Sequence, residues 1–119
     1  MSQMTVDQAL QIALNHQRSG QLAEAEEIYR QVLDVFPTQA DALHLLGGVY
    51  FQAKRFGDAL EHYRQVLRLA GPRESIYYNI AACYEQLKNR QLACKTLQEG
   101  RVGGNRWAKL GLKARDLGC

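Results

Sequence analysis

The chain has 119 residues, of which 46% are hydrophobic and 23% are charged, and its formal net charge is +3. This length fits one domain, and the composition is ordinary for a compact globular protein, so a largely disordered chain is excluded. The longest run without a polar residue, Leu45 to Phe51, falls far short of the roughly 20 residues that span a bilayer, so no membrane partner is expected.

Helical periodicity is the only regular pattern along the chain, and the signals for helix ends can be followed in order. Thr5 and Gln8 have the spacing of a capping box, so the first helix is expected to begin there. Thr38, which follows Pro37, is placed to cap a helix that begins near Ala40.

The later helix ends are marked in the same way. Gly71 and Pro72 are expected to end the fourth helix, because proline disfavours the helical conformation in the residue before it. Asn105 can cap a terminal helix. The chain therefore predicts a single domain over residues 1–119, with three antiparallel helix pairs and one terminal helix.

The three helix pairs have similar sequences at an offset of 34 residues. The matching sets are Ala25, Ala59 and Ala93; Tyr29, Tyr63 and Leu97; Ile12, Leu46 and Ile80; Ala13, Gly47 and Ala81; and His16, Tyr50 and Tyr84. Agreement at one offset in several registers indicates a stack of units, each too small to bury its own apolar face. Such a stack favours a binding surface as the functional feature.

The middle unit carries the pattern most completely, in Leu43, Leu46, Gly47, Tyr50, Ala59, Tyr63 and Pro72. This arrangement resembles the tetratricopeptide repeat. The resemblance implies an all-α fold, a right-handed α-α superhelix (solenoid) of three helical hairpins with a C-terminal capping helix. The expected repeats span about residues 6–39, 40–73 and 74–103.

The end of the chain departs from the pattern. In the second half of the third repeat, Leu97 replaces the aromatic residue and Gly100 stands where an apolar residue is expected. The offset then changes from 34 to 30, and residues 105–118 form either a capping helix or a partial fourth repeat. The polar face of this segment favours the cap, which such arrays need for solubility.

In the family that the chain resembles, first helices line the concave wall of the superhelix, where peptides or partner helices bind. The resemblance assigns partner binding to Leu10, Leu14, Gln17, Asp41, His44, Leu45, Gly48, Phe51, Gln52, Tyr78, Asn79 and Glu85. The same wall also carries Gln11, Arg18, Ser75, Ala82 and Gln86. Its apolar and neutral polar groups suit an amphipathic helix or an extended apolar segment. For Leu45 and Phe51, packing between repeats is an equally good interpretation.

Some family members bind the acidic tail of heat-shock chaperones through a clamp of lysine, asparagine and arginine side chains on this wall. The corresponding places in this chain hold Leu10, Leu14, Leu45, Ser75 and Asn79. Chaperone-tail binding by that clamp is therefore not expected.

The sequence contains no motif of hydrolytic or nucleotide-dependent catalysis, so no enzymatic activity, no catalytic residue and no cofactor are predicted. His16, His44 and His62 share no ligand spacing with one another or with a cysteine, so no metal site is predicted either. The expected partner is a protein or a peptide.

Charge is unevenly distributed along the chain. Residues 1–60 hold four Lys or Arg against seven Asp or Glu, a net charge of −3, whereas residues 61–119 hold eleven against five, a net charge of +6. A basic end could attract an acidic protein or nucleic acid. Aromatic side chains do not interleave these charges, apart from Trp107, so nucleic acid is not the expected partner.

The three cysteines are odd in number and lack CxxC spacing, which argues against a disulfide framework. With no signal segment visible at the N-terminus, they indicate a cytoplasmic protein. Cys83 and Cys94 are expected as small apolar residues of the third hairpin, and Cys119 as a reactive thiol.

These observations predict a non-enzymatic scaffold for protein–protein association. Two alternatives stay open. The first two repeats also look like the bacterial repeats that precede glycosyltransferase or other transferase domains, so the chain could be the N-terminal recruitment module of a larger transferase. It could also self-associate as a homo-oligomer, with the helix at Trp107 packing on the first hairpin of another copy.

Overall fold

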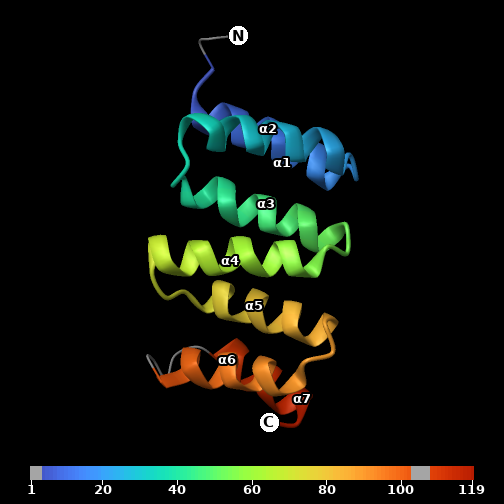
Figure 1. Cartoon of the computed structure of the whole chain (residues 1–119), viewed down its shortest axis with the longest axis vertical. Coiled ribbons are helices and arrows are strands. Elements are labelled where there is room, and N and C mark those ends of the chain that lie inside the picture. Colours follow the sequence, from blue (N-terminus) through green and yellow to red (C-terminus); the bar gives the residue numbers. More distant parts are fainter. Residues whose placement is uncertain (1–3, 103–107) are drawn as a thin grey trace.

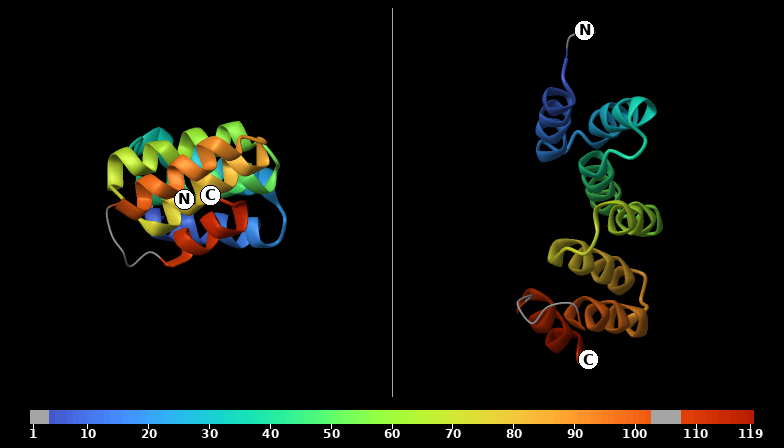
Figure 2. Two further views of the ribbon diagram at one scale, coloured as in Figure 1. Left: turned by 90° about the horizontal axis from the view of Figure 1, so that it is seen from below. Right: turned by 90° about the vertical axis from the view of Figure 1, so that its left-hand side faces the viewer.

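A computed structural model of the chain describes residues 4–102 and 108–119. These residues form seven helices: α1 (Val6–Arg18), α2 (Leu22–Val35), α3 (Ala40–Gln52), α4 (Phe56–Ala70), α5 (Glu74–Gln86), α6 (Arg90–Val102) and α7 (Ala108–Leu117). Helices α1 to α6 form three successive hairpins stacked along the long axis, and α7 lies beside α6 (Figure 1). The array measures 49 × 26 × 19 Å. The predicted all-α repeat solenoid is confirmed, and Figure 2 shows its stepwise progression from the side.

The helix ends follow the sequence signals, with one correction. The Thr5 side chain accepts a hydrogen bond from the Gln8 amide, and the Gln8 side chain accepts one from the Thr5 amide, so the predicted capping box is confirmed. Thr38 was the wrong choice for the cap of α3. The helix begins at Ala40, so Gln39 is the capping residue, and its side chain accepts from the Asp41 amide at 2.8 Å.

Each hairpin turns through a residue in the left-handed conformation at the same place in the repeat. Gly20, Lys54 and Lys88 have φ values of 80°, 64° and 63°. In all three turns the next residue donates its amide to a carbonyl five residues earlier, at 2.8 Å. The first repeat uses glycine, which adopts this conformation without strain, whereas the other two place a Cβ atom there. Gly118, with φ 76°, ends α7 in the same way.

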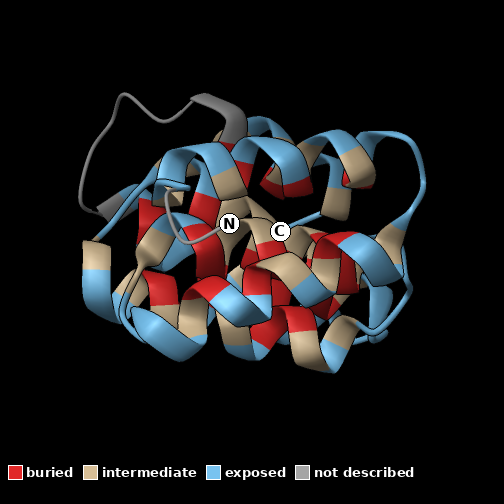
Figure 3. Cartoon of the chain, turned by 90° about the horizontal axis from the view of Figure 1, so that it is seen from above, coloured by how far each residue is buried: buried red, intermediate tan, exposed pale blue. Residues whose placement is uncertain are grey.

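Small residues allow the two helices of a hairpin to approach closely. Ala25, Ala59 and Ala93 are all fully buried, at 0% exposure. A Cβ atom at Gly47 would lie only 2.7 Å from Cε1 of Tyr63, so the tyrosine ring occupies the space that a side chain on α3 would need. The buried positions of successive helices therefore face one another in a continuous core (Figure 3).

An arginine–tyrosine contact joins each hairpin to the next and recurs with the repeat. Nη2 of Arg30 on α2 donates to the Tyr50 hydroxyl on α3 at 2.7 Å, and Arg64 on α4 makes the equivalent bond to Tyr84 on α5. The Tyr50 hydroxyl also donates to Glu26 at 3.0 Å. Burial opposes ionisation of Glu26, but its hydrogen bonds to Arg30 and Tyr50 outweigh that effect and lower its pKa.

The C-terminal helix α7 packs on α6 through a gap left by glycine. A Cβ atom at Gly100 would lie 2.6 Å from Cδ1 of Leu110 and 2.8 Å from Cγ of Tyr77. Leu110 itself is fully buried. The glycine that interrupts the repeat pattern in the third hairpin is therefore the residue that admits α7. The predicted cap at Asn105 and the packing of Trp107 lie outside the described residues.

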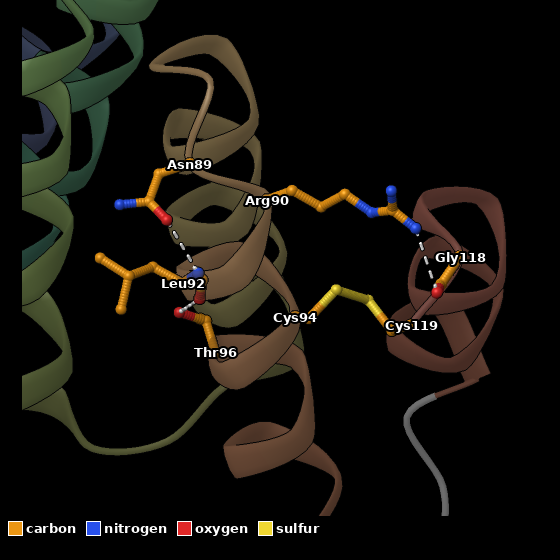
Figure 4. The surroundings of a disulfide bond; sticks show 7 residues. All are labelled: Asn89, Arg90, Leu92, Cys94, Thr96, Gly118 and Cys119. Carbon is orange, nitrogen blue, oxygen red and sulfur yellow. Dashed lines mark hydrogen bonds between the residues drawn. A yellow bond between two sulfur atoms is a disulfide. The ribbon is translucent and has the colours of Figure 1, made fainter.

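The expectation for two of the cysteines was wrong. Cys94 on α6 and Cys119 form a disulfide, with their Cα atoms 5.6 Å apart, and the Arg90 guanidinium donates to the Gly118 carbonyl beside it (Figure 4). Cys119 is therefore not a free thiol, whereas Cys83 is buried as expected. The inference of a cytoplasmic location rested partly on the cysteine pattern, and the disulfide removes that part of its support.

The left-handed lysines predict a stabilising substitution. Lys54→Gly should raise the free energy of unfolding by about 0.5–1 kcal/mol, because glycine removes the steric cost of a Cβ atom at positive φ. The midpoint of urea denaturation measures the change. Lys54→Ala keeps the Cβ atom and is the matched control, so it should leave the midpoint within error of wild type. Equal gains from glycine and alanine would contradict the explanation.

The disulfide predicts the number of accessible thiols. Unfolding without a reductant should expose one thiol per chain to an aromatic disulfide reagent, because only Cys83 is free among the described residues. In the native state even that thiol should react slowly, because burial raises its pKa to about 12. Cys119→Ser frees Cys94 and should expose two. Three reactive thiols in unreduced, unfolded wild type would show that the bond does not form.

Candidate functional site

The predicted binding wall contains a pocket between the first two hairpins. It has a volume of about 360 Å³ and is lined by Asp7, Leu10, Gln11, Leu14, Asp41, His44 and Leu45. Helices α1 and α3 supply these residues, because side chains three or four positions apart project from the same face of a helix. We call this feature the α1–α3 pocket. It brings together five of the predicted partner-binding residues, and Asp7 is an addition that the repeat mapping did not include.

The α1–α3 pocket combines an apolar floor with an acidic edge. Leu10 is buried, Leu14 and Leu45 are half-buried, and Asp7 and Asp41 are exposed. Apolar side chains that are partly open to solvent can gain free energy when a ligand covers them. Two carboxylates in the same place favour a ligand with positive charge beside its apolar groups. Leu10 and Leu45 also contribute to packing within the array, so both interpretations of Leu45 have a structural basis.

His44 is half-buried in this wall, and its surroundings favour the neutral form of the imidazole. Burial lowers the pKa of its imidazole, the nearby positive charge of Arg73 lowers it further, and Asp41 opposes the shift. Its ring meets the Tyr63 ring edge to face, with centroids 5.7 Å apart. Nε2 lies 3.3 Å from Nδ2 of Asn79, so in the neutral form it can accept a hydrogen bond from that amide. Protonation would remove this acceptor.

A second polar contact links α1 to α3, the first helices of successive hairpins, and its residues stabilise the fold. Nε2 of Gln17 donates to Oε1 of Gln52 at 2.7 Å, and Oε1 of Gln17 accepts from the Tyr29 hydroxyl at 2.9 Å. A Cβ atom at Gly48 would lie 3.0 Å from Nε2 of Gln17, so this glycine makes room for the glutamine. Gln17 is only 9% exposed. We therefore infer that Gln17 and Gly48 serve mainly to stabilise the fold, and that contact with a ligand is secondary for them.

Phe51, another predicted binding residue, packs within its own hairpin. Its ring meets that of Phe56, at the start of α4, with centroids 5.0 Å apart and an angle of 73° between the planes. The side chain is half-buried. The alternative interpretation of Phe51 as a packing residue therefore has direct support.

The third hairpin contributes Tyr78 and Glu85, and α7 reaches both of them. Nζ of Lys113 lies 2.6 Å from Oε1 of Glu85 and 5.6 Å from the centre of the Tyr78 ring. The hydrogen bond to Glu85 is the main cause of a raised pKa at Lys113. The repeat pattern could not predict these contacts, because the 34-residue offset is lost before α7. The predicted wall is thus divided into an open α1–α3 pocket and a C-terminal part that Lys113 partly covers.

Two features are absent from the described part of the chain. No group of three or more potential metal ligands gathers within residues 4–102 and 108–119. Over the same residues, no helix combines the length and apolar character that crossing a membrane requires.

Known sequence families and known structures both relate this chain to the tetratricopeptide repeat. Sequence models of the tetratricopeptide repeat match residues 5–71 and 76–99. No curated protein matches the chain. The fold is similar to that of the MamA protein, with a TM-score of 0.79 at 21% identity over 92% of this chain and 60% of that chain.

Two further structures share the fold at similarly low identity. The first TPR of Spaghetti (RPAP3), bound to the HSP90 peptide SRMEEVD, has a TM-score of 0.80 at 16% identity and covers 92% of this chain and 89% of its own. YrrB, a TPR protein with an unusual peptide-binding site, has a TM-score of 0.71 at 20% identity over 80% of this chain and 49% of that chain. The chain therefore spans less than two thirds of the MamA and YrrB chains.

His44 predicts a pH dependence of stability. Because its pKa is lowered in the folded state, the unfolded chain binds the proton more readily, so stability is complete above the unfolded pKa of about 6.5 and falls as the pH drops below it. His44→Gln should flatten this part of the curve, measured as urea midpoints across the range. Asn79→Ala removes the hydrogen bond and keeps the imidazole, so it should retain the dependence. Parallel curves for wild type and His44→Gln would contradict the prediction.

Proposed function

Since the chain belongs to the tetratricopeptide repeat family, we propose that it is a non-enzymatic scaffold that binds a peptide or a partner helix. The binding surface is the wall formed by the first helices of the hairpins, α1, α3 and α5, which we call the first-helix wall. The observation that carries the proposal is the α1–α3 pocket, where the apolar floor of Leu14 and Leu45 stays partly open to solvent. The Spaghetti structure contains a bound peptide, and YrrB has a peptide-binding site, so two proteins of the same fold support this mode of use.

The chemistry of the α1–α3 pocket narrows the class of partner. Asp7 and Asp41 favour a segment that places Lys or Arg beside its apolar side chains. An acidic segment such as SRMEEVD would meet these carboxylates. The places of the chaperone clamp, moreover, hold Leu10, Leu14 and Leu45 in the first two hairpins. The preferred ligand is therefore a basic, amphipathic segment.

Nucleic acid fits the structure less well than a protein partner does. Several cations of the basic C-terminal half already have intramolecular partners: Arg64 bonds to Tyr84, Arg90 to the Gly118 carbonyl, and Lys113 to Glu85. Cations held by neighbouring groups are less free to replace the counterions of a phosphate backbone. This argument favours the first-helix wall as the binding surface.

Selection from a display library of random linear peptides tests the proposal. Wild type should enrich basic, amphipathic sequences, because their apolar side chains cover Leu14 and Leu45 while their charges approach Asp7 and Asp41. The double variant Leu14→Glu, Leu45→Glu should bind an enriched, synthesised peptide at least about 10-fold more weakly, a difference of about 1.4 kcal/mol.

Leu69→Glu is the matched control, because Leu69 is 49% exposed on α4 and lies outside the pocket. It should bind the peptide like wild type, and circular dichroism should show equal helix content in all three proteins. Undiminished binding by the double variant would refute the assignment of the site. Asp41→Asn should weaken binding and reduce its dependence on salt, because it removes one attractive charge.

A further inference from the structure

The N-terminal end of the array exposes a surface that the other hairpins bury. Ile12, Leu46 and Ile80 occupy the same position in the three repeats, but their exposed fractions are 39%, 2% and 4%. In the second and third hairpins this face is covered by the last helix of the preceding hairpin, since α2 packs on α3 and α4 packs on α5. The first hairpin has no such cover among the described residues.

This uncovered face contains an apolar pocket with a volume of about 470 Å³. Its lining consists of Met4, Thr5, Val6, Ala9, Ile12, Ile28, Gln31, Val32, Val35 and Phe36. Val35 is 69% exposed, Phe36 50% and Met4 46%. Of the eight large apolar side chains that are well exposed in the described chain, four therefore lie on this one face, which we call the N-terminal face (seen from that end in Figure 3). Such clustering marks an interaction site.

The N-terminal face is electrically neutral. None of its lining residues is charged, and its polar side chains are limited to Thr5 and Gln31. The Thr5 hydroxyl oxygen already accepts a hydrogen bond from the Gln8 amide in the capping box. Two copies of such a face can meet without setting charged lining residues against one another, and their apolar groups then cover one another.

The described part of the opposite end offers no comparable apolar surface. In the described part of α7, Leu110 and Ala114 are buried against α6, and Leu112 is the single large apolar side chain that is well exposed, at 56%. Exposed Arg115 and Asp116 lie on the same helix. A head-to-tail contact would therefore set an apolar face against a largely polar one, whereas a contact between two N-terminal faces matches apolar with apolar.

We propose that the N-terminal face is a self-association surface, on which a second copy of this chain docks by a two-fold axis. In such a pair each Ile12 is covered by the first hairpin of the other copy, in place of the helix that covers Leu46 and Ile80 within one chain. The α1–α3 pocket shares none of the residues that line the N-terminal face, so both surfaces can be occupied together.

The size of the end face limits the area that the pair can bury. The two shorter dimensions of the array are 26 and 19 Å, so the pair buries on the order of 1,000 Å² in total, at the lower limit for specific interfaces. The dimer is therefore weak, and sedimentation velocity must cover concentrations from about 10 µM to about 1 mM.

Sedimentation of wild type and charged variants tests the proposal. Wild type should shift from monomer to dimer across that range and form no larger species. Ile12→Glu should weaken the pair at least about 10-fold, because it brings two carboxylates into the apolar contact. Leu112→Glu, at the opposite end, is the matched control and should dimerise like wild type. Equal helix content by circular dichroism shows that the variants fold.

A mixture of two variants distinguishes a two-fold pair from a head-to-tail contact. Ile12→Glu alone and Ile12→Lys alone should both be monomeric, and mixing them should restore a dimer, because the same face of each copy meets the other and the charges become opposite. A wild type that stays monomeric throughout overturns the proposal. So does loss of association in Leu112→Glu, or a series of species that grows beyond the dimer, since either result indicates a head-to-tail contact.

Discussion

The close approach of two helices at a small residue is the constraint on which the structure depends. Ala25, Ala59 and Ala93 are completely buried, and the ring of Tyr63 fills the space that a side chain at Gly47 would take. A hairpin held this tightly is thin, with little apolar surface of its own to bury, so it must stack on its neighbours. Stacking in turn sets the first helices side by side, which creates a wall where residues of α1 and α3 enclose the α1–α3 pocket.

Interactions that recur with the repeat hold the hairpins together. Interactions that occur only once make the surface of one repeat differ from that of the next. The bonds from Arg30 to Tyr50 and from Arg64 to Tyr84 have the same spacing and join successive hairpins in the same way. The contacts on the first-helix wall differ from one repeat to the next: an amide pair forms at Gln17, and an imidazole–amide pair forms at His44. Partner specificity is expected to come from this second kind.

The repeat period made the fold predictable. Where the period is interrupted, near the C-terminus, the contacts could not be predicted. A 34-residue offset was enough to place the buried alanines and the pairing of helices. The spacing of Thr5 and Gln8 was enough to place the capping box, because a cap depends on local sequence. Predicting the disulfide would have required the path of the chain after Gly100, where the offset changes. The mapping also assigned Gln17 and Phe51 to a binding wall, whereas hydrogen bonding to Tyr29 and ring packing on Phe56 use these side chains within the fold. Such partners belong to tertiary packing and leave no periodic signal.

The bond between Cys94 and Cys119 makes the two ends of the array unequal. In a linear stack each unit is supported only by its neighbours, so loss of structure spreads inward from whichever end opens first. At the C-terminal end, α7 is fastened covalently to α6, whereas the N-terminal hairpin is supported on one side by α3. Opening is therefore expected to start at the N-terminal hairpin. A protease that attacks partly opened chains would thus remove the first hairpin before it reached the fastened end.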